Sequence, residues 1–87
     1  MALIHLKIVT PEGKHFDDDA QRVMVRTTGG DVAILPHHID YCAALGSGEA
    51  RVTQPDGSVR RAHVEGGLIH AADDSVQVIT DHFEWKE

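Results

Sequence analysis

The stretch from Gly29 to Leu45, GGDVAILPHHIDYCAAL, gathers several side chains that could do chemistry. It holds two adjacent histidines, His37 and His38, followed by Asp40 and by Cys42, which is the only cysteine of the chain. Imidazole, carboxylate and thiolate groups are the usual ligands of zinc. A thiol close to an imidazole can also act as a nucleophile. The stretch therefore raises two chemical hypotheses, a metal site and a cysteine-based active site.

A metal site here would need ligands from elsewhere in the chain, because zinc takes three or four protein ligands. Neighbouring residues on an extended chain point in opposite directions, so His37 and His38 do not easily share one ion. His38 and Asp40 can share one, with His63 or His70 as a further ligand. The alternative is that these histidines hydrogen-bond to backbone or solvent, and both hypotheses stay open at this point.

The remaining candidates lack the surrounding residues that catalysis or ion binding requires. His38 precedes Cys42 by four residues and could form a dyad, but a cysteine within YCAAL is typical of a small buried packing residue. Ser47 and Ser58 lie in turn-like stretches without a nucleophile-elbow motif. The acidic run Asp17–Asp19 lacks the ligand pattern of a calcium loop and predicts a solvated loop instead. We expect no catalytic residue, no resident metal and no cofactor.

Composition predicts one small globular domain over residues 1–87, with 41% hydrophobic and 25% charged residues. The formal net charge is −6, from 14 acidic and 8 basic side chains, without the basic cluster that nucleic-acid binding requires. A single cysteine excludes an internal disulfide. No apolar stretch approaches the ~20 residues needed to cross a bilayer, and the N-terminus lacks a signal-peptide pattern. We therefore expect a cytoplasmic protein.

Apolar and polar residues alternate along most of the chain, which is the period of β-strands. Ile4, Leu6 and Ile8 would share one face of the first segment, and Val23 and Val25 one face of a later segment. Short turn signals separate these segments, namely TPEGK, TTGGD, LGSGE, QPDGS and AADDS. This pattern predicts an all-β fold, a flattened sandwich or barrel of about ten short strands with little or no helix.

Two of the turn motifs carry more specific predictions. QPDGS predicts a hairpin, with Pro55 presetting φ and Gly57 closing the turn. Gly66 and Gly67 interrupt a strand pattern, which favours a bend where the chain crosses from one sheet to another.

The strand-like segments and turns, taken in the order in which they occur along the chain, resemble the N-terminal β-sandwich domain of the epsilon subunit of rotary F-type ATP synthases. The matching pieces are LIHLKIVTPEGKHFDDD, TTGGDVAILPHHID, YCAALGSG, EARV, VEGGLIHA and SVQVITD. The resemblance covers essentially the whole chain, and LPHHIDYCAAL is closest to the alternative N-type subfamily. Ala33 stands where the family usually has glycine, and PHHIDY replaces the common PGHAPL. The sequence stops at DHFEWKE, so the family's C-terminal helical hairpin is not carried over, and neither are its inhibitory and nucleotide-binding roles.

The resemblance implies a non-catalytic rotor component of the central stalk that couples ion translocation to ATP synthesis or hydrolysis. It also implies two partners, the gamma subunit and the membrane rotor ring. The subunit would lie peripherally on the cytoplasmic face of the cell membrane and would touch the membrane only through the ring. The positions matching the family's ring-facing loop are Gly30, Asp31 and Val32. The positions matching its gamma interface are His38, Ile39 and Tyr41.

Several points stay open at the level of the sequence. The alternative function is a stand-alone metal- or small-ligand-binding β-sandwich that uses His37, His38 and Asp40. Phe16 is expected to fill the core, whereas Phe83 and Trp85 either pack on the sandwich or form a junction to a further segment.

Overall fold

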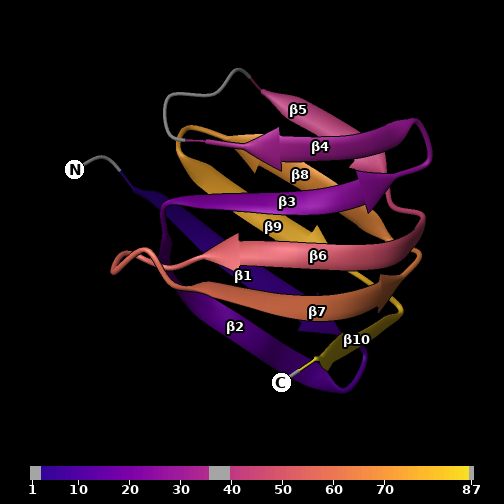
Figure 1. The fold of residues 1–87 in the computed structure, drawn as a ribbon. Helices are drawn as coiled ribbons and strands as arrows, with labels where there is room; N and C mark the ends of the chain where they lie inside the picture. Colours follow the sequence, from indigo (N-terminus) through magenta and orange to yellow (C-terminus); the bar gives the residue numbers. More distant parts are fainter. Residues whose placement is uncertain (1–2, 36–39, 87) are drawn as a thin grey trace.

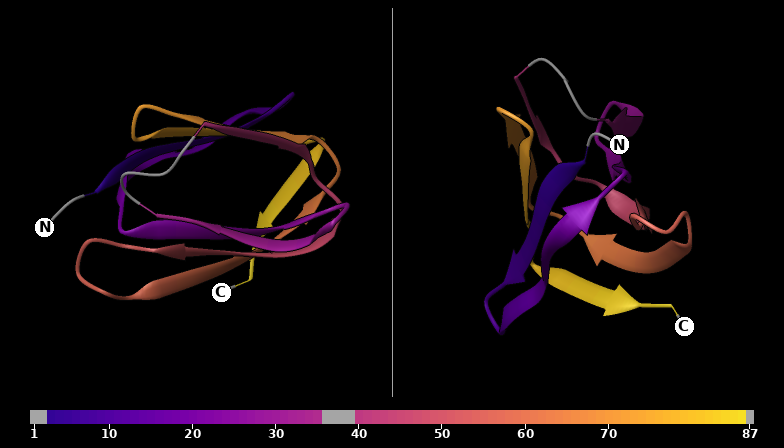
Figure 2. Two further views of the ribbon diagram at one scale, coloured as in Figure 1. Left: turned by 90° about the horizontal axis from the view of Figure 1, so that it is seen from above. Right: turned by 90° about the vertical axis from the view of Figure 1, so that its left-hand side faces the viewer.

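The structure is a computed structural model that describes residues 3–35 and 40–86. These residues form ten strands and no helix, and they therefore contain no helical segment that could cross a membrane. The strands make two layers packed face to face (Figure 1), and Figure 2 shows both layers from the side. The predicted all-β sandwich is thus confirmed. The strands are β1 (Ile4–Thr10), β2 (Gly13–Ala20), β3 (Arg22–Thr27), β4 (Gly30–Ile34), β5 (Tyr41–Ala44), β6 (Ser47–Thr53), β7 (Val59–Glu65), β8 (Leu68–Ala72), β9 (Ser75–Ile79) and β10 (His82–Trp85).

Each layer is a five-stranded sheet. Sheet A has the strand order β2-β1-β9-β8-β5, and sheet B has the order β10-β7-β6-β3-β4. All neighbouring strands are antiparallel except β1 and β9, which pair in parallel. The first and last strands therefore lie in different sheets, since β1 is in sheet A and β10 in sheet B.

The core lies between the two sheets and consists of the inward residues of the alternating segments. Ile4, Leu6 and Ile8 are at most 1% exposed, as are Val23 and Val25. Burying an aliphatic side chain of this size contributes about 1.5–3 kcal/mol relative to leaving it in water. The predicted inward faces of β1 and β3 are thus confirmed, and they hold the two layers together.

The chain crosses from sheet B to sheet A at Gly66 and Gly67, as the sequence predicted. β7 ends at Glu65 in sheet B, and β8 begins at Leu68 in sheet A. Both glycines have positive φ, 70° and 104°, a region that residues with a Cβ rarely adopt. The predicted hairpin at QPDGS is also present: it joins β6 to β7, and the backbone N–H of Gln54 donates to the Ser58 carbonyl at 2.8 Å.

Aromatic side chains close one side of the sandwich, where β2 and β10 form the edges of the two sheets. Phe83 is buried, and its ring lies 4.8 Å from the ring of Trp85. Trp85 also contacts Phe16 edge-on, and the Arg60 guanidinium lies 3.8 Å from the Trp85 ring centroid. Phe83 and Trp85 therefore pack on the sandwich, and Phe16 packs against the core while staying partly exposed.

Two expectations from the sequence were wrong. Asp17–Asp19 lie in strand β2 and not in a loop, because their backbone pairs with β1 along its length. Their side chains are nevertheless solvated, since β2 is an edge strand. Cys42 is exposed and not buried, because the alternation of β5 turns Tyr41 and Ala43 toward the core instead.

Candidate docking surface

An apolar row runs across the outer face of sheet A. It consists of Val9, Ile79, Leu68 and Ala44, which are direct cross-strand neighbours on β1, β9, β8 and β5. The neighbouring Ile8, Ile69 and Val78 are buried, and Ala43 packs against the core, so the four side chains of the row point away from the core. Ile79 is 43% exposed and Leu68 40% exposed. Contiguous apolar groups on a sheet face are typical of an interaction site.

A shallow hollow lies beside this apolar row on the same face. Its volume is about 200 Å³, and its lining residues are His5, Lys7, His70, Ala72, Ser75 and Gln77. Lys7, Gln77 and His70 are cross-strand neighbours that form a second, polar row, two residues away from the apolar row along β1, β9 and β8. Cys42 follows His70 in this second row, on the edge strand β5. The hollow and the apolar row thus form one continuous surface of mixed character.

A cluster of charged groups borders the hollow on the β1 and β2 side. His5 Nε2 lies 2.6 Å from Asp17 Oδ1, and His5 Nδ1 lies 3.5 Å from Asp19 Oδ1. The Lys14 ammonium donates to the other oxygen of Asp17 at 2.9 Å. The hydrogen bond with Asp17 raises the pKa of His5 above its ordinary value of 6.5. The hydrogen bonds from Lys14 and then from His5 lower the pKa of Asp17 below its ordinary value of 3.8.

This cluster predicts a small dependence of stability on pH. The raised pKa of His5 means that its contribution is present below about pH 6.5 and lost as pH rises through the folded-state pKa. The lowered pKa of Asp17 means that its contribution is lost only as pH falls through a value below 3.8. We expect His5→Gln to lower the melting temperature by a few degrees at most near pH 5, because exposed ion pairs contribute little. At a pH well above the folded-state pKa of His5, the two proteins should melt together. If His5→Gln lowered the melting temperature equally at both pH values, an electrostatic role for His5 would be excluded. His70→Gln serves as the control.

The residues predicted to face the rotor ring lie on β4, which is the edge strand of sheet B on the side opposite β10. They form a β-hairpin and not a loop, with the turn at Thr28 and Gly29 and with Gly30, Asp31 and Val32 inside β4. Asp31 is exposed and accepts hydrogen bonds from Arg26, at 3.1 Å to Nε and 3.5 Å to Nη2. Val32 is half-buried and packs against the core. Only Gly30 and Asp31 of this group therefore offer an exposed surface.

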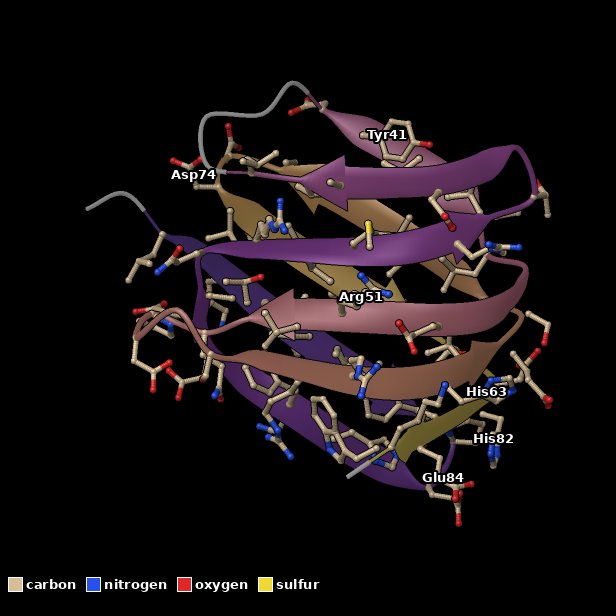
Figure 3. All side chains as sticks on the ribbon, viewed as in Figure 1. Tyr41, Arg51, His63, Asp74, His82 and Glu84 are labelled. Carbon is tan, nitrogen blue, oxygen red and sulfur yellow. The ribbon has the colours of Figure 1, made fainter. Side chains whose placement is uncertain are left out.

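The structure describes only part of the predicted gamma interface and of the alternative metal site. His37, His38 and Ile39 lie outside the described residues. Tyr41 is half-buried on β5 and packs against the core, and Figure 3 shows its ring at the edge of the sandwich.

The further ligands considered for a metal do not come together. His70 lies on the outer face of sheet A, and His63 on that of sheet B. The ring of His63 lies near that of His82, as Figure 3 shows. Within residues 3–35 and 40–86, no three His, Cys, Asp or Glu side chains gather in a way that could hold a metal ion.

The apolar row was not predicted from the sequence, although the sequence contains a signal for it. In the strand segments, Ile8-Val9, Leu68-Ile69 and Val78-Ile79 are pairs of adjacent apolar residues. Because successive side chains of a strand point to opposite faces, each pair must place one apolar residue outside. The register that aligns these outward residues in one row is visible only in the folded structure.

Comparison with known proteins gives a consistent result over nearly the whole chain. The family model described as the β-sandwich domain of the ATP synthase delta/epsilon chain matches residues 3–86. The ATP synthase epsilon chain of Ruminococcus albus is 36% identical over 88 residues, and that of Bacillus velezensis is 37% identical over 87 residues. Both alignments cover 100% of this chain, which spans 65% of the length of each relative.

Two of the solved structures with the same fold come from mitochondrial enzymes. A chain in the Euglena gracilis ATP synthase structure of OSCP, F1 and c-ring superposes with a TM-score of 0.91 and 21% identity, covering 98% of this chain and 54% of that chain. A chain in the central stalk and c-ring of the Tetrahymena thermophila enzyme superposes with a TM-score of 0.77 and 14% identity, covering 92% and 64% respectively. At these identities the likeness concerns the fold.

Proposed function

The chain belongs to the family of ATP synthase delta/epsilon chain β-sandwich domains, and from this we propose that it works as an epsilon-type subunit of the central stalk of a rotary ATP synthase. In this role it performs no catalysis. It joins the gamma subunit to the membrane rotor ring and helps to couple ion translocation to ATP synthesis or hydrolysis. We place it on the cytoplasmic face of the membrane, where it touches the membrane only through the ring.

The observation that carries this proposal is the apolar row on the outer face of sheet A. Ile79 and Leu68 are large apolar side chains, each about two-fifths exposed, on directly paired strands. Burial of apolar surface is the main favourable term in protein association, and a docked subunit would remove this row from water. We assign the outer face of sheet A to the gamma subunit.

The sandwich is suited to a mechanical role because backbone hydrogen bonds join neighbouring segments near the crossing at Gly66 and Gly67. The Leu45 N–H donates to the Gly67 carbonyl at 2.9 Å, and the Gly46 N–H donates to the Arg26 carbonyl at 3.0 Å. These bonds tie the turns at one end of the sandwich to both sheets. A unit built in this way resists twisting between its layers, which a rotor connection requires.

The ring contact is assigned to the hairpin of β3 and β4. Asp31 is exposed there and stands at the family's acidic position, which makes it suited to a basic polar loop of the ring. Its ion pair with Arg26 holds the carboxylate in a defined place on the outer face of sheet B. A charge pair of this kind directs orientation and association rate more than affinity.

Co-expression with the gamma subunit of the same organism, followed by size-exclusion chromatography, tests the proposed function. A stable one-to-one complex whose elution is unchanged by a chelator is the expected result. If no complex forms and the chelator lowers the melting temperature of the isolated chain, the stand-alone metal-binding hypothesis with His37, His38 and Asp40 is favoured instead.

A further inference from the structure

The hollow on the outer face of sheet A is lined by His5, which pairs with Asp17, and by polar side chains that are unpaired among the described residues. Among residues 3–35 and 40–86, the side chains of Lys7, His70, Ser75 and Gln77 make no hydrogen bond or ion pair. All four can donate hydrogen bonds, and they come from three adjacent strands, β1, β8 and β9. The hollow is therefore a concave group of donors with a lysine as its fixed positive charge.

The carboxylates nearest to Lys7 are already engaged. Asp17 is its direct neighbour across β1 and β2, but its two oxygens contact His5 at 2.6 Å and Lys14 at 2.9 Å. Asp19 lies within 3.5 Å of His5 as well. His5 and Lys14 thus engage two of the three carboxylates of Asp17–Asp19, and Lys7 makes no ion pair with any described residue. Although the chain has a net charge of −6, the unpaired ammonium of Lys7 and the donors around it make the hollow a candidate site for an anionic group.

The position of the hollow decides which anionic group it fits. Lys7, Gln77 and His70 lie two residues before or after Val9, Ile79 and Leu68 on their strands. This spacing places them about 7 Å from the apolar row along the strands. A surface that covers the apolar row would therefore lie over the hollow as well. Protein interfaces commonly have this arrangement, with an apolar centre and a polar rim.

We infer that the hollow receives the carboxylate of an aspartate or glutamate side chain of the subunit that docks on the apolar row. The inference rests on the proposed function, and it adds the chemistry of the partner. The partner's segment carries apolar side chains with an acidic side chain about 7 Å to one side. Lys7 supplies the charge, while His70, Ser75 and Gln77 supply hydrogen bonds that orient the carboxylate. This contact fixes the register of the partner along the strands of sheet A.

The test is a charge reversal, Lys7→Glu, measured as the dissociation constant of the complex with the gamma subunit. We expect the dissociation constant to rise at least tenfold, with most of the change in the association rate at low salt. Lys7→Gln, which removes the charge without placing a carboxylate opposite Asp17, should weaken binding by a smaller factor. Arg61→Glu is the matched control, because it makes the same charge change on the outer face of sheet B. It should leave the dissociation constant unchanged within about twofold.

Rescue identifies the partner's side chain. Each acidic residue on the docking surface of the gamma subunit is replaced by lysine, and one of these variants should bind Lys7→Glu better than it binds the unmodified chain. If Lys7→Glu and Lys7→Gln both bind as the unmodified chain does, while substitution of the apolar row abolishes the complex, the inference is wrong and the proposed function stands. If the unmodified chain forms no complex at all, the proposed function itself fails.

Discussion

Replacing Gly67 by alanine is expected to destabilise the domain by about 3–5 kcal/mol. The backbone at Gly67 has φ of 104°, which strains any residue with a Cβ. A Cβ at this position would also lie 2.0 Å from the Ile79 carbonyl oxygen and 2.6 Å from the Thr80 Cα. Both are backbone atoms, so no side-chain rotation relieves the clash. The strand crossing would have to move, and the crossing sets the relation of the two sheets.

Gly57→Ala separates the clash from the backbone strain. Gly57 also has positive φ, 90°, but nothing lies within 4 Å of a Cβ built there. This variant should lose only about 1–2 kcal/mol, and the comparison is made by urea unfolding of both variants and the unmodified chain. With a total stability of about 5–15 kcal/mol expected for a domain, Gly67→Ala should leave little margin. Equal losses in the two variants would show that the close approach at Gly67 does not constrain the fold.

The second large effect concerns binding. Leu68→Asp is expected to weaken the complex with the gamma subunit by at least about a hundredfold, or roughly 2.8 kcal/mol. It removes an apolar side chain from the middle of the apolar row and would place a charge under the docked partner, where its desolvation is unfavourable. Because Leu68 is 40% exposed on the outer face, folding should change much less than binding. Titration calorimetry gives the binding change, and thermal unfolding shows that the variant is folded.

Val59→Asp is the matched control for Leu68→Asp. Val59 is 52% exposed and lies on β7, so the same kind of substitution is made on the other sheet. It should not change the affinity for the gamma subunit. If Val59→Asp weakens the complex as much as Leu68→Asp does, the docking surface is not confined to sheet A, and the assignment of the apolar row is wrong.

The alternation of residue types predicted the fold well where one face of a strand is buried. In β1 and β3 the inward residues follow directly from the period of two. The prediction failed at the edges of sheet A, where β2 carries Asp17–Asp19 and β5 carries Cys42. An edge strand is held by backbone pairing on one side, and its side chains are partly solvated on both faces. Polarity then no longer distinguishes a strand from a loop, and a small residue is not necessarily buried.

The site was less predictable than the fold. The resemblance drew attention to the segment from Gly30 to Tyr41, and it placed Asp31 at an exposed position. The surface of sheet A remained hidden because its members are spread from Val9 to Ile79 in the sequence. They become neighbours only through the parallel pairing of β1 with β9 and the return of β8 beside it. Such pairing is a property of the topology, which a residue pattern alone does not specify.

We propose that the gamma subunit covers the outer face of sheet A, and Cys42 allows this contact to be measured directly. This single thiol is exposed and lies opposite His70 on that face. Its alkylation rate is measured in the isolated chain and in the complex. The same measurement is made on a double variant, Cys42→Ser with Arg61→Cys, which carries its thiol on sheet B. We expect the complex to slow alkylation of Cys42 at least tenfold and to leave the thiol on sheet B as reactive as before. Unchanged reactivity of Cys42, with protection of the thiol on sheet B, would contradict it.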